Sequence, residues 1–245
     1  MNDKLQQIDI LLGELNQYRA NENYRITEAL EIEYTYDSNR IEGNTLTLHE
    51  TDMVVNKGIT IVGKGLKEHL EAINHKEAID FIKDIAQKKE PISERVLLDI
   101  HAIVLHSIDK DNAGKYRRVP VIISGSKHIP PQPYLLQPQM DELFQWYEAN
   151  KDFMHPVVLA AQMHEKLVSV HPFIDGNGRT ARLVMNLILM QHGYPIANIK
   201  GDNETRRRYY ETLEEASSGD NSAFVEFIED VVIQSLTYYL KIIRG

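Results

Sequence analysis

The chain has 245 residues, of which 42% are hydrophobic and 26% charged, a composition typical of a soluble globular protein. It contains no cysteine, which excludes disulfides, thiolate metal sites and a cysteine nucleophile. The formal net charge of -9 disfavours nucleic-acid binding, because a duplex-binding surface needs a basic face. The N-terminus lacks the pattern of a signal peptide, and the apolar runs fall short of the roughly 18 residues of a membrane span. We therefore expect a cytoplasmic protein with no membrane partner.

Most of the chain shows the apolar spacing of amphipathic helices. The first three helices are predicted over residues 3–19, 24–42 and 66–88, and Gly43 is a suitable cap for the second. Pro91 and Ser93 indicate a new helix start. Later helices are predicted over 93–107, 138–149, 156–169, 179–192, 204–217 and 221–243.

Residues 114–133 interrupt this helical pattern. A β-branched run, VPVII, is followed by the turn sequence SGSK and then by HIPP, which predicts a short β-hairpin. The fold class is therefore mainly α with one hairpin. No segment resembles a linker, so we expect one compact unit, with an N-terminal helical region over 1–64 and a core with C-terminal helices over 65–245.

The most informative segment, 171–182, reads His-Pro-Phe-Ile-Asp-Gly-Asn-Gly-Arg-Thr-Ala-Arg and joins two apolar helices. Its Gly-Asn-Gly sequence at 176–178 permits positive φ, and successive amides before a helix N-terminus form a nest for anions. Arg179 and Arg182 lie in the first turn of that helix, where cations oppose the macrodipole unless an anion lies between them. They share one helix face and can hold a polyphosphate by bidentate hydrogen bonds.

Two side chains of the same segment could supply chemistry. A lone carboxylate beside phosphates usually binds Mg²⁺, which makes Asp175 the candidate metal ligand. His171 is the one group of the segment that accepts a proton near neutral pH. Each residue alone has an ordinary structural explanation, but the ordered set favours in-line attack of a hydroxyl on a phosphate.

Residues 171–182 resemble the signature of the Fic family at every fixed position. The resemblance implies a helical Fic-type core over about residues 65–230, a β-hairpin flap, and transfer of AMP from ATP to a hydroxyl of a target protein. It implies that His171 is the general base and that Mg²⁺ and ATP are bound by Asp175, Gly176, Asn177, Gly178, Arg179, Thr180 and Arg182.

Two other segments support the resemblance. Gly114-x-Tyr116-Arg117 and the residues from His128 to Pro131 resemble the two ends of the family's flap, which contacts the target's main chain. The resemblance assigns this role to Ser124, Gly125, Ser126, Lys127 and His128, although an ordinary surface hairpin fits the sequence equally well. Tyr209 and Tyr210 resemble the adenosine-side wall of the animal endoplasmic-reticulum Fic enzyme, which has asparagine where this chain has Ser217.

Ser38-Asn-Arg-Ile-Glu42-Gly43 resembles the family's inhibitory motif at the N-terminal side of the signature. Ser38 and Glu42 share one helix face. The resemblance implies that Glu42 pairs with Arg182, occupies the position of the γ-phosphate and leaves ATP in an unproductive pose. A plain helix end with a glycine cap would give the same residues, but the downstream signature favours inhibition.

Three other functions compete with adenylylation. The same His171 and Glu42 could serve removal of AMP from a modified protein, and the sequence does not separate the two reactions. Transfer of UMP or phosphate is disfavoured by the complete nest, and a non-catalytic nucleotide-binding regulator is disfavoured by the intact His171. The expected partners are ATP and a protein target, which could be the chain itself, and the resemblance is compatible with a homodimer.

Overall fold

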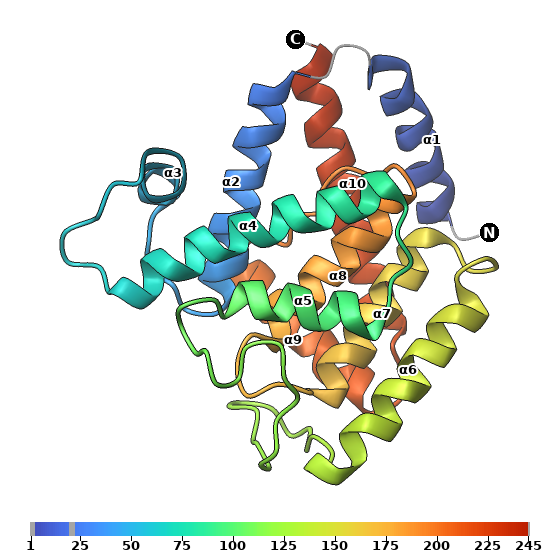
Figure 1. The fold of residues 1–245 in the computed structure, drawn as a ribbon. Coiled ribbons are helices and arrows are strands. Elements are labelled where there is room, and N and C mark those ends of the chain that lie inside the picture. Colours follow the sequence, from blue (N-terminus) through green and yellow to red (C-terminus); the bar gives the residue numbers. More distant parts are fainter. Residues whose placement is uncertain (1–2, 20–22, 245) are drawn as a thin grey trace.

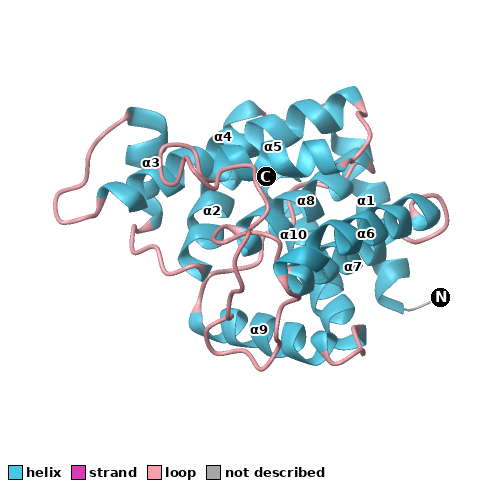
Figure 2. Cartoon of the chain, turned by 60° about the horizontal axis from the view of Figure 1, so that its bottom comes forward, coloured by secondary structure: helices cyan, strands magenta, loops and turns pink. Residues whose placement is uncertain are grey.

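The computed structural model describes residues 3–19 and 23–244, and the secondary structure assigned in these ranges is helical (Figures 1 and 2). The elements are α1 (Asp3–Tyr18), α2 (Tyr24–Ile41), α3 (Leu48–Lys57), α4 (Leu66–Lys88), α5 (Glu94–Val104), the short 3-10 helix η2 (Pro133–Leu135), α6 (Leu136–Asn150), α7 (Pro156–Val170), α8 (Asn177–Gln191), α9 (Asn203–Ser217) and α10 (Ser222–Arg244). No helix in these ranges is long and apolar enough to cross a lipid bilayer.

Helix α8 lies at the centre of the molecule (Figure 1). Almost its whole length is buried, and it packs against α4, α5 and α7. A helix buried on all sides is apolar around its circumference, as the run Leu183–Leu189 is here apart from the buried Asn186. Burial of α8 fixes the position of its N-terminus, where the conspicuous Gly-Asn-Gly sequence lies.

The two ends of the chain contribute to the same core. Helices α1 and α10 lie side by side (Figure 1), and Ile8 and Leu15 of α1 are fully buried. Helix α2 packs against α4 and contacts α8. This contact brings the C-terminal end of α2, with Ser38 and Glu42, to the N-terminal half of α8.

The predicted helices are confirmed to within a few residues at each end, but α3 was missed. It has a capping box formed by Thr47 and Glu50, and it ends at Gly58 in the left-handed conformation. Its contribution to the core is small, because within α3 only Thr51 and Val54 are buried. The helical periodicity that identified the other helices is therefore weak in this short segment.

The predicted hairpin is not confirmed, because no strand is assigned in residues 114–133 (Figure 2). Pro120, Pro130 and Pro131 lack the N–H groups that a ladder needs. The backbone is held instead by Arg117, whose guanidinium donates to the carbonyls of Val119, Pro131 and His171. The turn at its tip is present, with the amide of Ser126 donating to the carbonyl of Ile123.

Candidate active site

The loop between α7 and α8 has a tightly specified backbone. His171 ends α7 in the left-handed conformation, with φ of 48°, and Gly176 precedes α8 with φ of 81°. The side chain of Asn177 closes the loop, since Nδ2 donates to the carbonyl of Phe173 and Oδ1 accepts from its amide, both at 2.9 Å. Phe173 itself is fully buried. The backbone before the predicted nest is therefore fixed by the Asn177 hydrogen bonds and by the burial of Phe173.

His101 of α5, which we did not predict from the sequence, contacts this loop. Its ring stacks on Phe173 with centroids 3.6 Å apart. The amide of Gly114 donates to Nδ1, so Nε2 carries the proton and donates to the carbonyl of Asp175 at 3.0 Å. Burial lowers the pKa of His101 to about 4, which keeps the ring neutral at physiological pH.

His171 lines a cavity of about 500 Å³ together with Glu42, Gly178 and Tyr210. Burial lowers the pKa of His171 to about 4, and the Arg117 charge acts in the same direction. The imidazole is therefore neutral near pH 7, and its Nδ1 has no hydrogen-bond partner. A neutral, partly buried imidazole at the wall of a cavity can accept a proton from a bound hydroxyl group.

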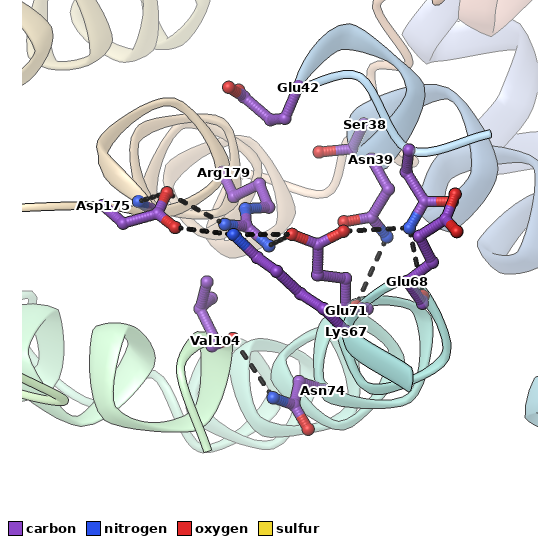
Figure 3. Close-up of polar contacts among 12 residues, drawn as sticks. Ser38, Asn39, Glu42, Lys67, Glu68, Glu71, Asn74, Val104, Asp175 and Arg179 are labelled. Carbon is purple, nitrogen blue, oxygen red and sulfur yellow. Dashed lines mark hydrogen bonds and ion pairs between the residues drawn. The ribbon is translucent and has the colours of Figure 1, made fainter. Parts of the chain in front are cut away.

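Asp175 lies in the loop before Gly176 and does not line this cavity. Its Oδ1 accepts from the amide of Gly176 at 2.6 Å and from Arg179 Nη2 at 3.2 Å, while Lys67 Nζ lies 3.3 Å from Oδ2 (Figure 3). Burial opposes ionisation, but the charges of Arg179 and Lys67 hold the pKa of the Asp175 carboxyl below its ordinary value. The side chain remains 44% exposed, so solvent or a hydrated cation can reach it.

Arg182 has a partner for each guanidinium nitrogen. Nε donates to Ser38 Oγ at 3.0 Å, Nη2 donates to the Ser38 carbonyl at 2.9 Å and to Glu42 Oε1 at 2.7 Å, and Nη1 donates to Tyr209 Oη at 3.3 Å. Burial alone would lower the pKa of Arg182, but the adjacent Glu42 raises it above the ordinary value. The predicted ion pair of Glu42 with Arg182 is present.

Arg179 is equally buried but less completely paired. Its side chain is 2% exposed, and its charged neighbours are Asp175 and Glu71, whose Oε1 lies 3.3 Å from Nη1. Nε has no acceptor, and Nη1 has only this ion-pair contact. Buried guanidinium donors without acceptors carry a desolvation cost, and an anionic ligand would remove it.

Gly178 is required by its surroundings. A Cβ atom at this position would collide with the Glu42 carboxylate and lie 3.0 Å from Arg182 Nη1. The absence of a side chain leaves room for a negatively charged group against the first turn of α8. In this structure the group is Glu42.

The remaining predicted residues divide into two groups. Tyr210 contributes to the cavity wall with Ser124, Gly125, Ser126, His128 and Ser217. Tyr209 also borders the cavity, but it is buried, and its hydroxyl contacts Arg182 and His164 Nε2. Thr180 is fully buried and does not line the cavity, and neither does Lys127, whose amide donates to Glu214.

Comparison with known proteins agrees with this geometry. The family model described as "Fic/DOC family" matches residues 91–189. A relative from Nematostella vectensis, named "Protein adenylyltransferase Fic", is 39% identical over 240 residues, which cover 97% of this chain and 53% of the relative. A solved fragment of Fic-1 from C. elegans is 32% identical with a TM-score of 0.86, covering 97% of this chain and 71% of the fragment.

The chain belongs to the Fic/DOC family.

A second Fic structure extends the likeness to a bacterial protein of similar length. A Fic domain containing signaling protein from Bacteroides thetaiotaomicron is 29% identical with a TM-score of 0.88, and the match covers 99% of this chain and 97% of that one. By contrast, the chain spans about half the length of the Nematostella relative, or less in the case of a Culex quinquefasciatus relative, where it spans 41%.

Proposed function

We propose that this chain is a protein adenylyltransferase that transfers AMP from ATP to a hydroxyl side chain and is restrained by Glu42. The observation that carries the proposal is a neutral His171 facing the same cavity as Gly178 at the N-terminus of α8. The name shared by the curated relatives, "Protein adenylyltransferase Fic", supports the same reaction.

ATP would bind with its phosphates at the first turn of α8. The nest of residues 176–178 and the guanidinium of Arg179, whose Nε has no acceptor, are suited to phosphate oxygens. Asp175 fits a Mg²⁺ ion, since it is charged, accessible and adjacent to the nest, and Mg²⁺ commonly uses one carboxylate plus substrate phosphates. The ion would neutralise the charge of the phosphates during the reaction.

The transfer itself requires one proton acceptor. The hydroxyl oxygen of the target attacks the α-phosphorus, the bond from that phosphorus to the bridging oxygen breaks, and pyrophosphate leaves with the bonding electrons. His171 takes the hydroxyl proton, which its neutral state allows. Arg179 and the nest stabilise the charge on the leaving phosphates.

Glu42 would restrain the reaction by occupying Arg182. While this pair is formed, Nη2 of Arg182 is occupied by Glu42, and the carboxylate lies where Gly178 leaves space for an anion. ATP would therefore bind without the contact that aligns its α-phosphorus for attack. Release of Glu42 would free both the guanidinium and the space.

The loop of residues 124–128 would receive the target, with Tyr210 beside the adenosine. At present this loop is held by Glu214 of α9, which accepts from Ser126 Oγ and from the amide of Lys127. A target segment pairing with the Lys127 amide would have to displace Glu214. A homodimer and a cytoplasmic location also stay predictions from the sequence.

The decisive experiment compares wild type with Glu42→Gly in the presence of Mg²⁺ and ATP, using mass spectrometry to find AMP on the protein itself and on lysate proteins. A charge-assisted hydrogen bond contributes about 1.5–3 kcal/mol, so release of Arg182 should raise transfer about 10- to 100-fold. Addition of EDTA should abolish it. Absence of AMP on every protein in the Glu42→Gly reaction would refute the proposal.

Removal of AMP from a modified target is a second candidate, favoured by one observation. Glu42 and His171 line the same cavity, and the Glu42 side chain is 33% exposed, so its carboxylate can orient a water molecule. Incubation of an AMP-modified target with each variant tests this reaction. Loss of AMP with wild type but not with Glu42→Gly would favour it.

A further inference from the structure

Glu71, on the inner face of α4, joins the two parts of the molecule that meet at the phosphate site. Its side chain is 10% exposed, with Oε1 3.3 Å from Arg179 Nη1. Its Oε2 accepts from Asn44 Nδ2 at 3.0 Å, and its backbone carbonyl accepts from Asn39 Nδ2 at 3.3 Å. Figure 3 shows Glu71 and Asp175 approaching Arg179 from different helices and loops.

The two carboxylates beside Arg179 both lie within ion-pair distance of Lys67 Nζ, but they differ in backbone setting and exposure. Asp175 lies on a loop and is 44% exposed. Glu71 lies within a helix, is nearly buried and is fixed by Asn44 through its other oxygen. If Asp175 turns to a metal ion, Glu71 is the carboxylate that remains within ion-pair distance of Arg179 among the residues that the structure describes.

A buried guanidinium without a negative neighbour is costly, and it moves or lowers the stability of the site. Arg179 therefore needs a permanent counter-charge on the side away from any ligand if it is to stay in place before ATP arrives. Glu71 meets that need because it neutralises Arg179 and leaves Nε without an acceptor.

We infer that Glu71 is the positioning residue of Arg179, which it holds ready for the β-phosphate of the nucleotide. The inference rests on the proposed function. It adds to the site a residue that lies 108 positions before Arg179 in the sequence. Asn44 extends the effect, since it fixes Glu71 from a position just two residues after Glu42. Both arginines of α8 are thus controlled from the same turn at the end of α2.

The test uses the Glu42→Gly protein and measures the affinity for ADP and for AMP by calorimetry, with and without Glu71→Gln. Glutamine keeps the shape but loses the charge, and its amide either faces Arg179 with a donor or loses Asn44. We expect affinity for ADP to fall about tenfold, the low end for a charge-assisted hydrogen bond, with affinity for AMP unchanged. Glu77→Gln is the matched control, because Glu77 is an exposed carboxylate of the same helix.

A double-mutant cycle makes the assignment specific. In the Arg179→Ala background, Glu71→Gln should cause no further loss of ADP affinity, because the residue through which it acts is absent. An unchanged ratio of ADP to AMP affinity in the single variant would overturn the inference. An equal loss of both affinities would overturn it as well, since that result indicates a general structural role.

Two further outcomes are distinguishable. If Glu42→Gly transfers AMP while Glu71→Gln leaves the ADP affinity intact, the proposed function stands and the role of Glu71 fails. If Glu42→Gly neither binds nucleotide nor transfers AMP, both fail. Should Glu71→Gln not fold, Glu71→Asp retains the charge at a shorter reach and should lose about threefold in ADP affinity, a partial break of the same bond; no loss would overturn the inference.

Discussion

Arg179 and Arg182 lie three residues apart on α8, and both side chains are almost completely buried, yet their surroundings differ. Arg182 is bound by the end of α2, and each of its nitrogens has an acceptor. Arg179 faces α4 and the loop before α8, its Nη1 contacts only Glu71, and its Nε has no acceptor. Every nitrogen of Arg182 is bonded to the protein, whereas Arg179 has a nitrogen without a partner.

Under the proposed function, this difference indicates where the restraint would act. Glu42 binds Arg182, whereas Asp175 bonds to the amide of Gly176 and to Arg179. A nucleotide could therefore bind to the protein as it stands, and the restraint would act on alignment.

The largest expected effect is on the rate of AMP transfer, when the proton acceptor is removed and both arginines are kept. In the Glu42→Gly background, His171→Asn should lower AMP transfer by about 10²–10⁴, the usual contribution of a general base. Asparagine tolerates the left-handed backbone that His171 adopts, so the loop should keep its shape. Affinity for ADP should stay within a factor of about two, as measured by calorimetry. A rate within tenfold of the parent variant would contradict the assignment of His171 as base.

The second effect concerns the buried histidines beneath the two arginines. Burial lowers the pKa of His164, beside Arg182, to about 3 and that of His101, beside Arg179, to about 4. Each is neutral in the folded protein but has an ordinary value near 6.5 when unfolded, so the unfolded state binds more protons in acid. Stability is therefore full above about pH 6.5 and is lost as pH falls toward 4.

Between pH 7.5 and 5.5 the free energy of unfolding should fall by about 1.4 kcal/mol for each of these histidines. Urea unfolding at the two pH values measures the loss. His164→Gln, which retains an acceptor for Tyr209, should reduce the pH-dependent loss by about the same amount. An identical pH dependence in the variant and wild type would show that the pKa of His164 does not differ between the folded and unfolded states.

A third prediction compares the arginines directly. Arg182→Lys removes the planar fork that binds Ser38 and Glu42, and should lower the free energy of unfolding by about 2–3 kcal/mol. Arg179→Lys should cost no more than about 1 kcal/mol, because the donors that it removes are partly unpaired. Urea unfolding of the two variants provides the comparison. Equal losses in the free energy of unfolding would mean that the contacts of the two arginines stabilise the protein equally.

The smallest expected effect comes from weakening the contact between α2 and Arg182 while the charge of Glu42 is kept. Ser38→Ala deletes the acceptor of Arg182 Nε but keeps the backbone carbonyl bond, so stability should fall by about 1 kcal/mol. Basal AMP transfer should rise about fivefold if the same bond holds the restrained state. Ser218→Ala, directly after the end of α9, is the control, since its hydroxyl contacts only Glu215 among the described hydrogen bonds. A change in stability without a change in transfer would separate Ser38 from the restraint.

Residues 171–182 could be interpreted from the sequence because their functions are local. A nest, a carboxylate and two arginines within twelve residues share one loop and one helix turn, so their proximity is fixed by chain geometry alone. Most helices were also predictable, since their buried faces repeat with helical spacing. Helix α3 has little buried face and was missed for that reason.

Tertiary structure decided which of these groups are engaged. Glu71, His101 and Glu214 are single residues without a motif, and packing of α4, α5 and α9 brings them to a loop far along the chain. The loop at 114–133 was predicted as a hairpin from its β-branched residues, but its backbone groups bond to Arg117 and Glu214 instead of to a second strand.

Local sequence patterns were thus enough to predict most of the helices and to identify the Gly-Asn-Gly loop and His171 as candidates for phosphate binding and proton transfer. Which partners each arginine has could be seen only in the folded structure, where every nitrogen of Arg182 has an acceptor and Nε of Arg179 has none. A buried side chain finds its hydrogen-bond partners on the helices next to it. Core packing between segments distant in sequence determines which helices those are.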